Sequence, residues 1–177
     1  IGAFQHLPNL MAARFFLEGV WPKLQKYSPT LHIIAGRRPQ FYLERYRDTA
    51  FVDLNVPGVE VEEFVVDVRP AYERAAIVIA PLLASAGTNI KIMEAMAMNK
   101  AIVSTPAGVN GLDLEAGRDV IVTDTAAEMA EAIAALFEDH GKRKAIEEQA
   151  RRTAELKYDW ERIAEEQKRL YSSLLQV

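Results

Sequence analysis

The chain has 177 residues, of which 50% are hydrophobic and 26% charged, and its formal net charge is −4. This composition is typical of a soluble globular protein with one domain, and the acidic balance argues against nucleic-acid binding. The absence of cysteine excludes disulfides and thiolate metal sites, and the three scattered histidines argue against a zinc site.

Along the chain, short apolar runs alternate with amphipathic stretches, and no apolar run has the length of a membrane span. Residues 1–4 are interpreted as the end of a strand. Because neither an initiator Met nor a signal-peptide pattern is present there, we expect the chain to be part of a longer protein. Further strands are predicted at 31–35, 59–64, 76–80, 101–104 and 120–122. Helices are predicted at 8–25, 40–47, 67–74, 88–98 (with Thr88 as N-cap), 125–137, 142–156 and 160–175.

Six short strands separated by helices predict right-handed crossovers between parallel strands. The expected fold class is α/β. It is a doubly wound, Rossmann-like domain that spans residues 1–177 and contains one parallel sheet of about six strands. Such sheets bind ligands beyond the carboxyl ends of their strands, so the candidate site residues are those that follow each strand.

The segment after the strand 76–80 offers the most chemistry. A loop of small residues that includes Ser85 runs into the helix 88–98, and the N–H groups at a helix start form an anion site. Gly87, Lys91 and Glu94 are expected to share one helical face. There a lysine suits a phosphate and a glutamate suits the vicinal hydroxyls of a sugar. The alternative is a surface Lys–Glu pair without a ligand.

Two other strand ends hold weaker candidates. Arg37 and Arg38 follow Gly36, and they either clamp a phosphate or extend into solvent. The loop 105–111, which contains Gly108, either brings its backbone close to a ligand or is a plain turn.

Taken together, the sequence resembles the retaining GT-B glycosyltransferases of family 4, also called group 1, and is most similar to bacterial capsule and exopolysaccharide members. The central match is Gly87-Thr88-Asn89-Ile90-Lys91-Ile92-Met93-Glu94-Ala95-Met96-Ala97, followed by residues 101–105 and 108–112. The resemblance covers nearly the whole chain, because it also includes Leu7-Pro8-Asn9, Trp21-Pro22, residues 33–37 with Pro39, and Tyr158-Asp159-Trp160.

The resemblance implies that this is the C-terminal, donor-binding half of a GT-B fold. Glu94 would bind the ribose hydroxyls, and the nucleotide base would lie near Phe64 and Val65. The loop and helix start from Ser85 to Thr88, together with Gly108, would contact the diphosphate and the sugar. The cation would be supplied by Lys91, by Arg37 or Arg38, or by the other half of the enzyme. No catalytic residue is assigned, and neither a metal nor a cofactor is expected, because the nucleotide-sugar is itself a substrate.

Further expectations concern the rest of the enzyme. The sugar would pass with retention to a sugar, glycolipid or polysaccharide acceptor held by an N-terminal domain that this chain lacks, in polysaccharide or glycolipid biosynthesis. No nucleic acid is an expected partner. The expected location is the cytoplasm, and peripheral association with the inner face of the membrane is compatible with such an acceptor.

Two departures from the family pattern keep other functions open. The family's E-x7-E motif would place its first glutamate at Ala86, and residues 2–9 contain neither the Arg nor the Lys that many members carry there. A non-catalytic nucleotide-binding module and a sugar-nucleotide epimerase-like domain therefore remain as alternatives.

Overall fold

The computed structural model describes residues 1–85 and 87–175. Its strands are β1 (Leu31–Ile34), β2 (Val59–Glu62), β3 (Ile77–Ala80), β4 (Ala101–Ser104) and β5 (Ile121–Val122). Its helices are α1 (Leu7–Phe15), α2 (Trp21–Leu24), α3 (Pro39–Arg45), α4 (Arg47–Ala50), α5 (Arg69–Arg74), α6 (Ile90–Ala97), α7 (Pro106–Val109), α8 (Ala126–Glu138), α9 (His140–Lys157) and α10 (Trp160–Leu174).

All strand pairs are parallel, as expected, but the strands form two small sheets. β1 pairs with β2, and β3, β4 and β5 form the second sheet in that order. The prediction of one sheet with about six strands is therefore wrong, since the described residues contain five. The reason is that residues 1–4 do not form a strand. The amides of Gly2 and Phe4 donate to the carbonyls of Ile34 and Ala35, so this segment meets β1 only at the C-terminal end of the strand.

The long helix predicted at 8–25 is present but interrupted. Between α1 and α2, residues Phe16–Val20 form a π-helical segment, and a 3-10 turn at Gln25–Tyr27 ends the run. Pro22 has no N–H to donate to the carbonyl four residues earlier, and this local loss favours the wider turn.

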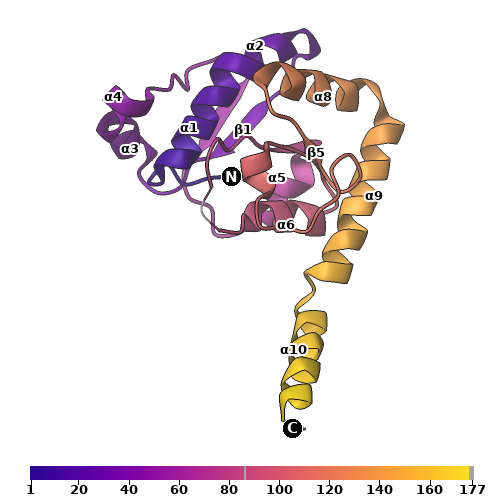
Figure 1. Ribbon diagram of the computed structural model, residues 1–177. Coiled ribbons are helices and arrows are strands. Elements are labelled where there is room, and N and C mark those ends of the chain that lie inside the picture. Colours follow the sequence, from indigo (N-terminus) through magenta and orange to yellow (C-terminus); the bar gives the residue numbers. More distant parts are fainter. Residues whose placement is uncertain (86, 176–177) are drawn as a thin grey trace.

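Helices cover both faces of the second sheet, which is the doubly wound arrangement (Figure 1). β4 shows this most clearly, because all four of its residues are buried. Ala101 and Val103 belong to one core with α8 and the π-helical segment, whereas Ile102 belongs to another with α6 and α9. Burial of both strand faces explains why β4 begins with three consecutive apolar residues rather than alternating apolar and polar ones.

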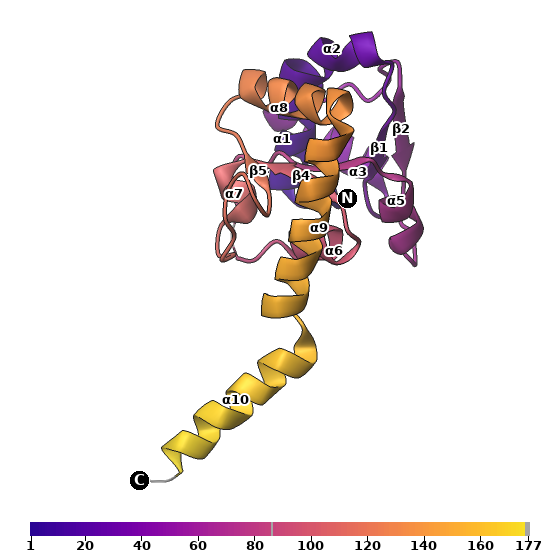
Figure 2. The same ribbon diagram turned by 90° about the vertical axis from the view of Figure 1, so that its right-hand side faces the viewer.

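Two C-terminal helices, α8 and α10, begin directly after side chains that cap them. Thr125 and Glu128 form a capping box at the start of α8, and the Asp159 carboxylate accepts from the amides of Glu161 and Arg162 at the start of α10. α10 extends away from the body of the protein (Figure 2), and it contains no buried residue. Among the described residues, no helix is both long and apolar enough to cross a bilayer.

Candidate functional site

The loop after β3 is tied to α7 through Asn89. The Asn89 side-chain amide donates to the carbonyl of Gly108 at 2.7 Å and lies 3.0 Å from the Ser85 hydroxyl oxygen. Helix α6 begins at Ile90, and Asn89 is its N-cap. The prediction of Thr88 as the N-cap is therefore wrong. The Asn89 side chain bridges two loops instead of capping its own helix, since it makes no capping hydrogen bond.

Gly108 is required where it stands. A Cβ atom at this position would lie 2.1 Å from the Ser104 hydroxyl oxygen and 2.7 Å from the Ala80 carbonyl oxygen. Only a glycine allows α7 to pack so closely over the ends of β3 and β4. Gly108 is thus buried behind the loop, and its carbonyl holds the loop in place through Asn89.

Gly87 and Thr88 lie outside the helix and are exposed. Gly87 therefore does not share a helical face with Lys91 and Glu94, contrary to the expectation from spacing. Its φ of +85° is left-handed, and no atom lies within 4 Å of the Cβ position. Backbone at such a position is accessible to a ligand. Ala86, the position of the family's first motif glutamate, lies outside the described residues.

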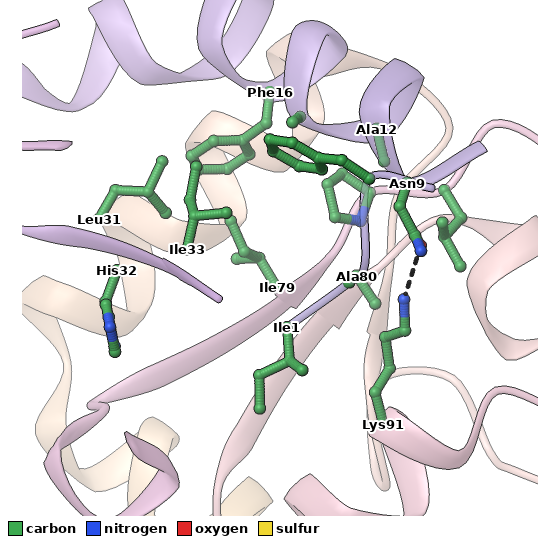
Figure 3. A pocket seen from close by; sticks show the side chains of 15 residues that line it. Ile1, Asn9, Ala12, Phe16, Leu31, His32, Ile33, Ile79, Ala80 and Lys91 are labelled. Atoms are coloured by element: carbon green, nitrogen blue, oxygen red, sulfur yellow. Dashed lines mark hydrogen bonds between the residues drawn. The ribbon is translucent and has the colours of Figure 1, made fainter. Parts of the chain in front are cut away.

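Lys91 points from α6 toward the beginning of the chain (Figure 3). Its ammonium group donates to the Asn9 side-chain oxygen at 3.0 Å, and the Asn9 amide donates to the Ala3 carbonyl at 3.0 Å. Burial lowers the pKa of Lys91, although the nearby Glu94 carboxylate partly opposes that shift. Lys91 and Asn9 line a cavity of about 80 Å³ together with Gly2, Pro81 and other residues.

Glu94 lies one turn after Lys91 and has a different partner. The buried Tyr72 hydroxyl from α5 donates to the Glu94 Oε2 atom at 2.9 Å and lies 3.3 Å from the Lys91 carbonyl oxygen. Because Lys91 is directed to Asn9 and Glu94 to Tyr72, the simple surface Lys–Glu pair does not form. Glu94 is half-buried and is not among the residues that line the 80 Å³ cavity.

The residues after β1 and β2 meet at a second location. The Arg37 guanidinium lies 4.6 Å from the ring centroid of Phe64, which is 53% exposed, and Val65 next to it is half-buried. Arg38, whose φ is +54°, instead lies over the Phe41 ring at 5.0 Å. The two arginines therefore face different aromatic rings and do not form a joint phosphate clamp.

Three site residues were missed as functional candidates from the sequence. Asn9 and Asn89 stand inside the segments of resemblance, but nothing in their spacing indicated that they would hold Lys91 and the loop. Tyr72 occurs in a short helix without a motif. Within residues 1–85 and 87–175, no group of three or more His, Cys, Asp or Glu residues is arranged to bind a metal ion.

Comparisons with known proteins place the chain in a family. The family model of glycosyl transferases group 1 matches residues 1–139. The C-terminal domain of a glycosyl transferase group 1 family protein from Francisella tularensis shares the fold with a TM-score of 0.69 and 19% identity, over 90% of this chain and 84% of that domain. No curated protein sequence matches the chain.

Two longer proteins also share the fold. HepE from Anabaena, solved in complex with UDP, has a TM-score of 0.76 and 20% identity, over 97% of this chain and 48% of its own. Sucrose-phosphate synthase from Thermosynechococcus elongatus has a TM-score of 0.67 and 18% identity, over 92% of this chain and 43% of its own. The chain thus spans less than half the length of these two proteins. Since the family model matches well over half of its residues, the chain belongs to the group 1 glycosyl transferases.

Proposed function

We propose that this chain binds the nucleoside diphosphate of a nucleotide-sugar and serves as the donor-binding domain of a glycosyltransferase. The observation that carries the proposal is the first part of α6, where Lys91 and Glu94 lie one turn apart beyond the carboxyl end of β3. Lys91 is a half-buried cation suited to phosphate, and Glu94 is a carboxylate held by Tyr72. Family membership supports this ligand class, as do the structures of HepE with UDP and with UDP-glucose.

The diphosphate is assigned to the loop and the helix start. Backbone N–H groups at the start of α6, near the exposed Gly87 and Thr88, are suited to an anion, and Ser85 adds a hydroxyl. Lys91 adds the charge, after exchanging its contact with Asn9 for a phosphate oxygen. These protein groups replace a metal ion in the proposal, so binding needs neither a metal nor a cofactor.

The ribose and base are assigned to flanking groups. Each oxygen of the Glu94 carboxylate can accept two hydrogen bonds, which suits the vicinal hydroxyls of a ribose. The exposed ring of Phe64 with Arg37 over it, together with Val65, forms an apolar and cationic surface suited to a flat base.

The remaining steps of transfer are assigned to a larger protein. We propose transfer with retention to an acceptor sugar, glycolipid or polysaccharide that a separate N-terminal domain positions, in a cytoplasmic pathway that includes the inner membrane surface. Positioning of the acceptor against the donor accounts for much of the rate in such reactions. The 177-residue chain is therefore expected to bind a nucleoside diphosphate and to transfer no sugar.

Calorimetric titration tests the binding. UDP, GDP, ADP and the corresponding nucleosides are titrated into the wild-type chain and into Glu94→Ala and Lys91→Ala, with a metal chelator present. Glu94→Ala is expected to weaken both nucleoside and diphosphate by about 1.5–3 kcal/mol, or roughly ten- to hundredfold. Lys91→Ala is expected to weaken the diphosphate much more than the nucleoside.

A variant of the exposed Lys144 on α9, Lys144→Ala, is the matched control and should bind like the wild type. Binding of no diphosphate by the wild type would contradict the donor site. Equal weakening of nucleoside and diphosphate by Lys91→Ala would contradict the assignment of Lys91 to phosphate.

A further inference from the structure

Tyr72 connects α5 to α6, the helix that carries Lys91 and Glu94. It is 3% exposed and packs in the same core as Ile92, Ala95 and Met96 of α6. Its hydroxyl emerges from this core beside two acceptors, the Glu94 Oε2 atom at 2.9 Å and the Lys91 carbonyl oxygen at 3.3 Å.

The chemistry of the pair favours Glu94 as the acceptor. A phenol has one proton to donate, and a carboxylate is the stronger and here the nearer acceptor. Burial raises the pKa of Tyr72, and the hydrogen bond to Glu94 raises it further, so the phenol stays protonated. Tyr72 thus remains a hydrogen-bond donor at neutral pH.

The contact fixes the carboxylate without saturating it. Oε2 retains one further lone pair, and among the described residues no side chain or amide donates to Oε1. A glutamate side chain that is already held in one rotamer loses less conformational freedom when a ligand binds. The carboxylate therefore keeps acceptor capacity for two hydroxyls in a fixed orientation.

We propose that Tyr72 is a positioning residue for ligand recognition, which orients the Glu94 carboxylate toward a vicinal diol. This inference rests on the proposed role of Glu94 in ribose binding. Tyr72 itself does not contact the ligand and acts only through Glu94. Its effect should therefore be present for a ligand with both ribose hydroxyls and absent for a ligand without them.

A double-mutant cycle with two ligands tests the proposal. UDP and 2′,3′-dideoxy-UDP are titrated calorimetrically into the wild type, Tyr72→Phe, Glu94→Ala and the double variant. Phenylalanine keeps the ring in the core and removes only the hydroxyl. Tyr72→Phe is expected to weaken UDP about three- to tenfold, to leave the dideoxy analogue unchanged, and to have no further effect in the Glu94→Ala background.

Tyr27→Phe is the matched control. Tyr27 also donates its hydroxyl to a glutamate, Glu138 of α8, but this pair is exposed and lies on other elements. Its loss should leave the affinity for both ligands unchanged, which separates a general effect of tyrosine removal from a specific effect on Glu94.

The outcomes distinguish the two levels of the argument. If Glu94→Ala leaves UDP affinity unchanged, the proposed function fails together with the inference. If Glu94→Ala weakens UDP but Tyr72→Phe does not, or weakens both ligands equally, only the role of Tyr72 is overturned.

A second measurement does not depend on folding of a Tyr72 variant. The Cζ carbon of ¹³C-labelled Tyr72 is followed by NMR in the wild type and in Glu94→Ala. Its chemical shift should change in Glu94→Ala and should be retained when UDP is added to the wild type. If UDP binding moved the Cζ chemical shift of the wild type to the value seen in Glu94→Ala, the hydrogen bond would break on binding, and the proposal would be overturned.

Discussion

Substitution of Gly108 by alanine should destabilise the protein, and it should also disturb the loop of the candidate site that the Gly108 carbonyl holds through Asn89. The new Cβ would lie 2.1 Å from the Ser104 hydroxyl oxygen, which is itself hydrogen-bonded to the Ala80 and Thr105 carbonyls in a fully buried position. Either the hydroxyl rotates and loses its carbonyl partner, at about 1–3 kcal/mol, or α7 moves outward. Overpacking of a dense core adds about 1–3 kcal/mol.

We therefore expect Gly108→Ala to lower the free energy of unfolding by about 2–6 kcal/mol, a large part of the 5–15 kcal/mol typical of a domain. Urea denaturation followed by circular dichroism measures this loss. Ser104→Ala in the Gly108→Ala background removes the nearest clashing atom and should restore part of the stability, but not all of it, because the Ala80 carbonyl oxygen would still lie 2.7 Å away.

Gly87→Ala is the control for this prediction. It also replaces a glycine in the same site, but at an exposed position with no atom within 4 Å of the new Cβ. Only the left-handed backbone then opposes alanine, at about 1–2 kcal/mol. Equal losses for the two variants, or a loss below about 0.5 kcal/mol for Gly108→Ala, would refute the argument from close packing.

Three further predictions concern charge and the C-terminal helix. Because the pKa of Lys91 is lowered by burial, its charge is lost at a lower pH than for an ordinary lysine. UDP affinity measured by calorimetry from pH 7 to 10 should therefore fall more steeply than uridine affinity, and Lys91→Arg should remove that difference. Burial alone would raise the pKa of Asp119, but hydrogen bonds from the Glu115 amide, Thr153 and Gln149 outweigh it and lower the pKa. The resulting stabilisation of the folded state is present above the ordinary Asp pKa and is lost as the pH falls from there through the lowered pKa. Asp119→Asn should therefore lower the free energy of unfolding, measured by urea denaturation, by about 1–3 kcal/mol at pH 7 and by less at pH 3. Since α10 has no buried residue, a chain that ends at Asp159 should unfold within about 0.5 kcal/mol of the full chain, and a larger loss would show that α10 stabilises the body.

The sequence was sufficient to place most elements because the local signals are strong. β1, β3 and β4 are short segments dominated by Ile, Val, Leu and Ala, and turn residues such as Gly36 and Pro81 follow closely. The helix predicted from residue 125 corresponds to α8, whose start is fixed by the Thr125–Glu128 capping box. These features depend on neighbours within a few residues.

The sheet arrangement and the site contacts depend on distant residues, and this is where prediction failed. Residues 1–4 looked like a strand, but a strand requires a partner along its whole length, and they meet only the end of β1. The Tyr72–Glu94 and Lys91–Asn9 contacts join residues 22 and 82 positions apart, so no local pattern encodes them. Likewise, the left-handed backbone of Arg38 separates it from Arg37, although the two are adjacent in sequence.

The most direct test of the proposed donor site is to map UDP binding on the chain by NMR. Backbone amide shifts of the ¹⁵N-labelled wild type are followed during addition of UDP with a metal chelator present. The account predicts that the largest shifts lie at Ser85, at residues 87–91 and at Glu94, with smaller shifts at Phe64 and Val65. Saturable shifts confined to other surfaces, or no shifts at millimolar UDP, would contradict the assignment of this site to a nucleotide-sugar donor.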